Sequence, residues 1–211
     1  MRTIHQHVFF PSDNLQLEGN LMFPADRSSC PGVVICHPHP VYGGDMNNNV
    51  VMGIKAALED AGFVILRFNF RGVNLSEGNF DGGKGEIKDV IAAVSFLKDQ
   101  TMVDNNRLFL AGYSFGSWVG LKAVLKVGEF RAVAGVSPPF GIFNFDFLTD
   151  ISAPILLMVG EQDDFCKMKE FESVFNKIQS SKKRVVLPGA DHFCWEREGE
   201  VGEIVRSFFC C

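Results

Sequence analysis

One serine stands between two glycines in the pentapeptide Gly112-Tyr113-Ser114-Phe115-Gly116, directly after a short apolar run at residues 108–111. A segment compatible with a helix follows, so we expect a strand, a sharp turn and a helix. Such a turn forces the serine into a strained backbone conformation with an exposed hydroxyl, and the flanking glycines remove Cβ atoms that would collide. Ser114 is therefore a predicted nucleophile, with an ordinary loop as the alternative.

A serine hydroxyl is a poor nucleophile at neutral pH, so it needs an imidazole to accept its proton and a carboxylate to orient that imidazole. Both groups follow later in the chain. Asp163 and Asp164 come after an apolar run at residues 155–159, and His192 comes after the next such run. Singly these would be a solvated acid and an ordinary loop histidine. Their joint order after separate predicted strands indicates a triad of Ser114, Asp163 and His192, although the pattern hardly separates Asp163 from Asp164.

Acyl transfer to a serine also requires two N–H donors for the oxyanion that forms on the attacked carbonyl. The first is the backbone N–H of Phe115, the residue after the predicted nucleophile. The second should come from the loop after the apolar run at residues 33–36, which reads His37-Pro38-His39-Pro40. Because proline has no N–H, His39 is the donor that stands between the two prolines.

The same loop is compatible with a different chemistry. His-x-His is a common spacing of metal ligands, and imidazole suits zinc. A metal-dependent hydrolase would use His37 and His39 together with Asp45, Asp191 or His192. A rigid loop without a chemical role is the third interpretation. We favour the oxyanion interpretation, which implies no metal and no cofactor.

A substrate pocket would be built from loops beside the predicted nucleophile. The planar guanidinium of Arg71 suits a substrate carboxylate, but an internal ion pair with Glu86 or Asp89 is the more common use of such a residue. The Phe-rich residues 140–148 either wall an acyl pocket or close the core over the sheet edge. The residues predicted to line the pocket are Tyr42, Arg71, Phe140 and Phe143.

The elements that position these groups alternate regularly along the chain. A predicted hairpin is followed by short apolar runs that alternate with segments of helical spacing. This alternation is typical of a mostly parallel sheet covered by helices on both faces. Ligands bind such sheets beyond the carboxyl ends of the strands, where the candidate residues fall. The predicted strands, about eight, are residues 4–10, 15–23, 33–36, 63–68, 108–111, 132–136, 155–160 and 184–187, and the predicted helices are residues 47–60, 87–97, 118–126, 171–178 and a closing helix from about residue 200.

Composition limits the class of protein. The 211 residues are 46% hydrophobic, which suits one substantial core, so we expect a single domain over residues 1–211. The net charge is −5 and the basic residues are scattered, which favours a small-molecule acyl substrate over nucleic acid or membrane. The N-terminus has no signal-peptide pattern, and the six cysteines form no C-x-x-C pair. We therefore expect reduced thiols, a cytoplasmic location and a monomer or homodimer.

The connection between Ser137 and Pro154 contains only 16 residues, numbers 138–153, which is too short for a helical cap domain. An uncapped site favours small, soluble acyl compounds over long lipid chains.

The motifs together resemble the small bacterial α/β hydrolases related to dienelactone hydrolases. The resemblance spans nearly the whole chain. It implies an α/β-hydrolase fold with an antiparallel first hairpin and no cap domain. The motifs that carry it are His37-Pro38-His39-Pro40 with Gly43-Gly44 and Asn49, residues 66–72, residues 112–116 and residues 190–193.

For the site, the resemblance implies a triad of Ser114, Asp163 and His192, with the acid three residues after Gly160, and an oxyanion hole made by the N–H groups of His39 and Phe115. Dienelactone hydrolases carry cysteine where this chain has Ser114, which argues against dienelactone as the substrate. The expected activity is hydrolysis of a small ester or thioester. The alternatives are the metal-dependent hydrolase and a catalytically silent interaction module with the same fold.

Overall fold

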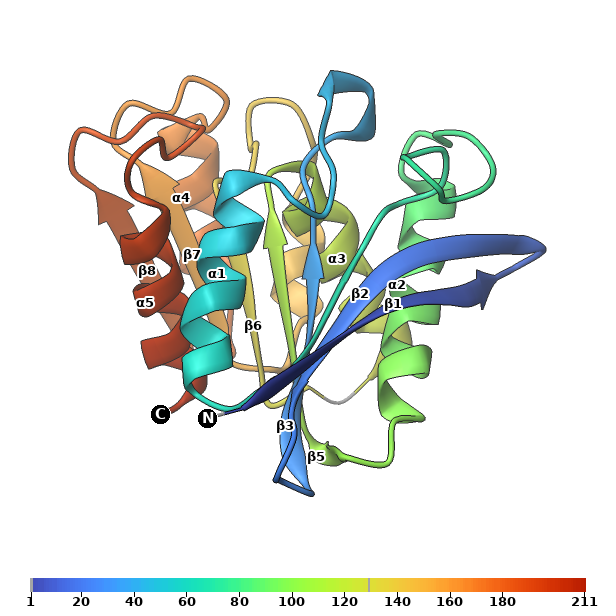
Figure 1. The fold of residues 1–211 in the computed structure, drawn as a ribbon. Helices are drawn as coiled ribbons and strands as arrows, with labels where there is room; N and C mark the ends of the chain where they lie inside the picture. The colour runs from blue at the N-terminus through green and yellow to red at the C-terminus, as the bar shows by residue number, and fades with distance from the viewer. Residues whose placement is uncertain (1, 129) are drawn as a thin grey trace.

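The computed structural model describes residues 2–128 and 130–211. It contains an eight-stranded sheet in the order β1-β2-β4-β3-β5-β6-β7-β8 (Figure 1). β1 is antiparallel to β2 and β2 to β4, and every other neighbouring pair is parallel. The predicted mostly parallel sheet with an antiparallel first hairpin is confirmed. The strands are β1 (Thr3–Ser12), β2 (Leu15–Pro24), β3 (Cys30–Cys36), β4 (Val64–Phe68), β5 (Val103–Tyr113), β6 (Ala132–Val136), β7 (Ile155–Gly160) and β8 (Lys182–Leu187).

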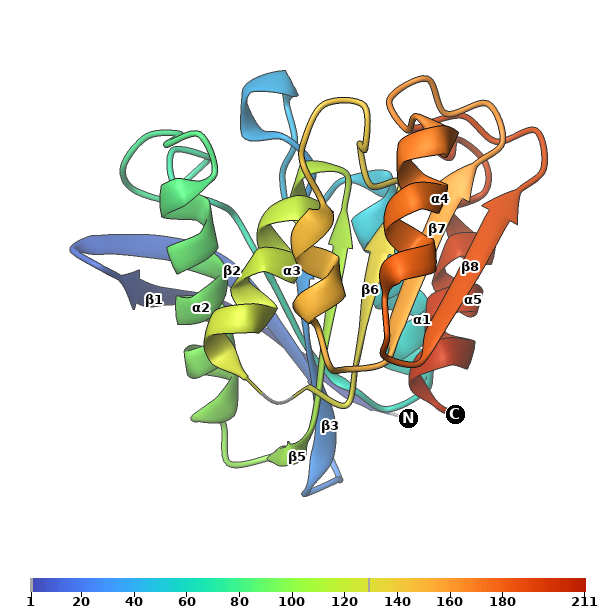
Figure 2. The ribbon, with the colours of Figure 1, turned by 180° about the vertical axis from the view of Figure 1, so that it is seen from behind.

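Helices cover both faces of the sheet. α1 and α5 pack side by side on one face, and α2, α3 and α4 lie on the other, which Figure 2 shows from behind. No helix within residues 2–128 and 130–211 is long and apolar enough to cross a membrane. The helices are α1 (Asn49–Asp60), α2 (Lys84–Lys98), α3 (Phe115–Val127), α4 (Met168–Lys177) and α5 (Glu198–Phe209), and the 3₁₀ helices are η1 (Pro40–Tyr42) and η2 (Asp146–Asp150).

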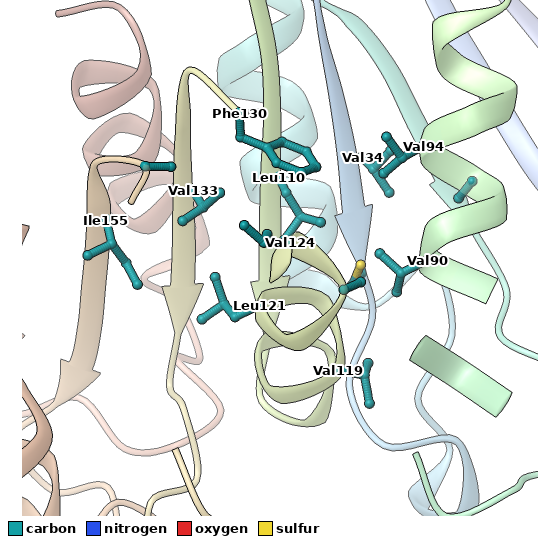
Figure 3. Close-up of a cluster of buried hydrophobic side chains, with 14 of the residues drawn as sticks. Val34, Val90, Val94, Leu110, Val119, Leu121, Val124, Phe130, Val133 and Ile155 are labelled. Carbon is teal, nitrogen blue, oxygen red and sulfur yellow. The ribbon is translucent and has the colours of Figure 1, made fainter. Parts of the chain in front are cut away.

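Buried aliphatic side chains fill the space between the sheet and each helix layer. In Figure 3, Val34 and Leu110 project from the central strands, Val90 from α2, and Val119 and Val124 from α3. All five are buried. Strands that are covered on both faces read as continuous apolar runs, which is why the sequence revealed the central strands so clearly.

The strand order brings two loops together. The chain passes from β3 to β4 on one side and then returns to β5 on the other side of β3, where Cys36 is the register partner of Gly112. The carboxyl ends of β3 and β5 are therefore neighbours at the point where the direction of the connections reverses. Ligands bind at such switch points in open α/β sheets. The loop that begins at His37 and the turn at Ser114 consequently lie beside each other.

Several elements begin earlier than predicted. β5 starts at Val103, α3 starts at Phe115 and α2 starts at Lys84. The start of α2 is set by Glu86, whose carboxylate accepts the backbone N–H groups of Asp81 and Gly83, both at 2.7 Å. The bond to Gly83, the N-cap residue, is a capping-box contact, which hydrophobic spacing does not reveal.

The segment between β6 and β7 contains the short helix η2 and no cap domain, as predicted. Phe140 is buried and packs on Phe145 and Phe171, with ring centroids 4.4 and 5.2 Å apart. Phe140 is thus placed as in the alternative in which the Phe-rich residues close the core over the sheet edge. The aromatic rings of this segment pack against α4 and cover the edge of the core.

Candidate active site

The turn after β5 has the strained geometry that the pentapeptide predicts. Ser114 has φ of 53° and ψ of −119°, a region that non-glycine residues rarely occupy. Its backbone N–H donates to Val136 of the neighbouring strand at 2.9 Å. A Cβ on Gly112 would lie 2.3 Å from the carbonyl oxygen of Gly116. Only glycine permits this close approach of strand and helix, so the local sequence determines the turn.

Three side chains from three different loops form a chain of hydrogen bonds. The Ser114 hydroxyl donates to Nε2 of His192 at 2.9 Å, and Nδ1–H of His192 donates to the carboxylate of Asp163, with both oxygens at 2.9 Å. These residues follow β5, β8 and β7 respectively, and all three are buried. The arrangement has the geometry of a nucleophile, a base and an orienting acid.

The structure separates the two adjacent acids that the sequence pattern left open. Asp163 is buried, and its Oδ1 also accepts the backbone N–H groups of Phe165 and Cys166 at 2.9 and 3.1 Å. Asp164 is exposed. The carboxylate beside His192 is therefore held in place from both sides, and it belongs to Asp163.

The histidine loop reaches the serine because the chain permits two close contacts. A Cβ on Gly160 would lie 2.3 Å from the carbonyl oxygen of Ala190, so glycine allows the two loops to touch. The buried hydroxyl of Tyr113 donates to the backbone carbonyl of His192 at 3.1 Å. The sequence analysis missed Tyr113. Its position at the end of a buried strand was a usable signal, since a buried tyrosine hydroxyl needs a hydrogen-bond partner.

The loop after β3 lies against the start of α3. A Cβ on Gly116 would lie 2.4 Å from the carbonyl oxygen of His37, and the ring centroid of His39 is 4.8 Å from that of Phe115. The imidazole of His39 accepts the N–H of Val41 at 3.2 Å, so this side chain caps η1. The backbone N–H groups of His39 and Phe115 donate to no other residue that the structure describes. Both are free to bind a ligand.

His37 is fully buried, and both of its ring nitrogens are occupied. Nδ1–H donates to the carbonyl oxygen of Pro38 at 2.7 Å, and Nε2 accepts the backbone N–H of Phe70 at 3.0 Å. Burial lowers the pKa of His37 to about 4, so the ring is neutral at pH 7. A metal would need the lone pair that Phe70 already occupies. The donor set therefore does not fit the metal alternative, and His37 instead fastens the His39 loop to the end of β4.

The remaining predicted pocket residues lie in different environments. The guanidinium of Arg71 is buried and donates to Asp89, with Nη2 to Oδ1 at 2.7 Å and Nε to Oδ2 at 3.0 Å. The internal ion pair, which the sequence analysis gave as the more common use of such a residue, is thus the one observed, and this guanidinium does not face a pocket. Tyr42 is 86% exposed above His39. Phe143 stacks on Trp118, and its ring lies 6.0 Å from that of Phe115.

Comparison with known proteins covers nearly the whole chain. The sequence model of the Dienelactone hydrolase family matches residues 17–204. An uncharacterized protein of Rickettsia prowazekii is 30% identical over 209 residues, which are 95% of this chain and 87% of that protein.

Solved structures agree with this match. An alpha-beta serine hydrolase homologue from Coxiella burnetii is 33% identical, with a TM-score of 0.87 over 96% of each chain. A serine hydrolase without lid from Xanthomonas campestris is 28% identical, with a TM-score of 0.84 over 99% of this chain and 96% of that one.

Proposed function

The chain belongs to the dienelactone hydrolase family and is a hydrolase of the α/β-hydrolase fold; from this premise we propose that it cleaves a carboxylic ester or thioester of a small acyl group through an acyl-enzyme on Ser114. One observation carries the proposal, the unbroken hydrogen-bond chain from Ser114 through His192 to Asp163. We take residues 1–211 as one catalytic domain.

In the first step the Ser114 oxygen attacks the acyl carbonyl while Nε2 of His192 takes the hydroxyl proton. Asp163 keeps the proton on Nδ1, which leaves Nε2 free as the base, and its charge stabilises the imidazolium that forms. The carbonyl oxygen becomes an oxyanion. The free backbone N–H groups of His39 and Phe115 are the donors that would bind it.

In the second step the tetrahedral intermediate collapses. The imidazolium of His192 gives its proton to the departing alcohol or thiol, and the acyl group stays on Ser114. A water molecule then loses a proton to His192 and attacks the acyl-enzyme, which releases the acid and regenerates the serine.

Two features of the site favour a small, uncharged acyl group. The segment between β6 and β7 adds no cap, so little apolar surface is available to enclose a long chain. The Arg71 guanidinium, the cation that could have bound a substrate carboxylate, is already paired with Asp89. A carboxylate on the acyl group would therefore find no free cation at Arg71.

Labelling with a fluorophosphonate tests the proposal. We expect the wild-type protein to be labelled at Ser114, and Ser114→Ala to lose all labelling and to lower kcat on a short ester by about 10⁴-fold or more. The control is Ser207→Ala, which removes an exposed serine on α5 and should change neither measurement. A wild-type protein that resists labelling while folded would favour the silent interaction module. Activity that disappears with a chelator and returns with zinc would favour the metal-dependent hydrolase.

A further inference from the structure

A cavity of about 400 Å³ lies at the amino ends of the central strands, opposite the triad. In Figure 1 the triad loops lie at the top of the sheet, and the C-terminal end of α5, which borders the cavity, lies at the bottom. The cavity therefore shares no loop with the proposed active site. Its walls are the turn from β2 to β3 (residues 27–31), the turn from α1 to β4 (residues 61–63), Arg107 and Phe109 of β5, Arg131, and residues 209–211.

Three arginines line this cavity, out of nine in the whole chain. Nε of Arg107 donates to Asp104 at 2.8 Å, and its Nη2 donates to the carbonyl oxygen of Ser29. Among the residues that the structure describes, no carboxylate lies within 4.0 Å of the guanidinium of Arg27 or of Arg131. Two of the three guanidinium groups thus have no carboxylate partner among the described residues, in a chain whose net charge is −5.

The floor of the cavity is apolar. Phe63, Phe109 and Phe209 form a triangle of rings, with centroids 5.3 Å apart for Phe63 and Phe109, 4.8 Å for Phe109 and Phe209, and 6.5 Å for Phe63 and Phe209. All three are nearly fully buried, so each exposes only a small part of its ring. Ser28 and Ser29 also line the cavity.

We infer that this cavity binds a small organic anion, a phosphate monoester or carboxylate carried on an apolar group. Guanidinium groups match the planar or tetrahedral oxygens of these anions, and hydrogen bonds between ions are stronger than those between neutral groups. Arg107 is already held in place by Asp104 and Ser29, so binding a ligand would cost little conformational entropy at this side chain. The apolar part would rest on the phenylalanine floor. The volume lies within the range of small-molecule sites.

Phenyl phosphate is a probe with both required parts. We expect its titration into the whole protein to shift the amide resonances of residues 27–30, 61–63 and 209–211, and to leave those around Ser114 unchanged. Inorganic phosphate should bind at the same place about tenfold more weakly, since it lacks the apolar ring.

The variants Arg27→Gln and Arg131→Gln should each weaken binding of phenyl phosphate by about tenfold. Arg206→Gln is the matched control, because Arg206 lies on the same helix as Phe209 but pairs with Glu203 and does not line the cavity; its affinity should equal that of the wild type. Ester hydrolysis should be the same in all three variants. Three results would each overturn the inference: no binding up to 10 mM, roughly the top of the useful range for such weak ligands; equal affinity in the Arg27→Gln/Arg131→Gln double variant; or shifts confined to the Ser114 loops.

Discussion

The two ends of the sheet hold their polar side chains in different ways. At the carboxyl end Ser114, Asp163 and His192 are buried, and each hydrogen-bonds to another member of the set. At the amino end Arg27 and Arg131 are exposed, with no carboxylate close by among the described residues. Proton transfer depends on distances and angles, whereas attraction of an anion depends mainly on charge. The triad at the carboxyl end therefore needs side chains in fixed positions, whereas the arginines at the amino end do not.

The loops at the carboxyl end of the sheet contain backbone conformations that are energetically costly on their own. Ser137 and Cys194 have positive φ values of 44° and 52°, although neither is glycine. Hydrogen bonds hold both of them: the N–H of Ser137 donates to Met158 at 2.7 Å, and the N–H of Cys194 donates to Asp191 at 2.9 Å. Strain of this kind persists only where the surroundings determine the conformation. Substitutions at this end should therefore have large effects that depend on the exact atom removed.

The largest of these effects is expected for the acid. Asp163→Asn should lower kcat by about 10⁴-fold, because the amide cannot accept the proton on Nδ1 of His192 in the same way and the imidazole loses its orientation. Asp164→Asn, one residue away but exposed, should change kcat by less than about twofold. Steady-state kinetics on one short ester measures both. The reverse ranking would assign the acid to Asp164.

The next effect concerns the proposed oxyanion donor. His39→Pro removes the backbone N–H and should lower kcat by about 10²–10³-fold, the usual cost of losing one such donor. His39→Ala keeps the N–H and should retain most of the activity.

Because a third successive proline could distort the loop, His39→Pro must first be shown to fold and to bind a ground-state analogue as the wild type does. If His39→Ala lost as much activity as His39→Pro, the imidazole and not the N–H would be the functional group.

A smaller effect concerns stability. It tests how much the buried His37 contributes to the free energy of unfolding. The pKa of His37 falls from 6.5 to about 4 in the folded protein. Between these values the unfolded chain binds the extra proton, so the free energy of unfolding should fall as the pH drops from 6.5 toward 4, by about 3 kcal/mol in total from this residue. Above pH 6.5 the full contribution is present.

Urea denaturation at several pH values measures this effect. His37→Gln should be less stable than the wild type at pH 7, since it loses the bond to Pro38, but should lose less stability on acidification. The control is His5→Gln, which removes a half-exposed histidine on β1 and should keep the acid sensitivity of the wild type. Identical pH slopes in all three proteins would show that His37 is not the group responsible.

The smallest effect is the preference among substrates. Activity should peak at acyl chains of roughly two to six carbons, because an uncapped cleft encloses only a small group well, and each additional methylene should then change kcat/KM by only a few-fold, as expected for about 0.8 kcal/mol per partly enclosed CH₂. A series of esters and thioesters with matched leaving groups measures this profile. A maximum at long chains would mean that Tyr42 and Phe143 border a deeper channel than the short β6–β7 segment suggests.

The order of the strands and helices, though not all of their first residues, could be predicted from the amino-acid sequence. Apolar runs, helical spacing and the glycines around Ser114 are local signals, and each predicts its strand, helix or turn without reference to distant residues. The position of His192 after a strand was predictable from such local signals too. Its place at the same edge of the sheet as Ser114 followed, since the carboxyl ends of parallel strands meet at one edge. These features depend on neighbours a few residues apart.

Which side chains contact one another could be seen only in the folded protein. Asp163 lies beside His192 and Asp164 does not, Arg71 donates to Asp89 and not to a ligand, and His37 is occupied by the N–H of Phe70. These contacts join residues 18 to 33 positions apart. Each depends on how two loops or helices pack, and packing is set by the shapes of many side chains at once, which the spacing of residues along the chain does not contain.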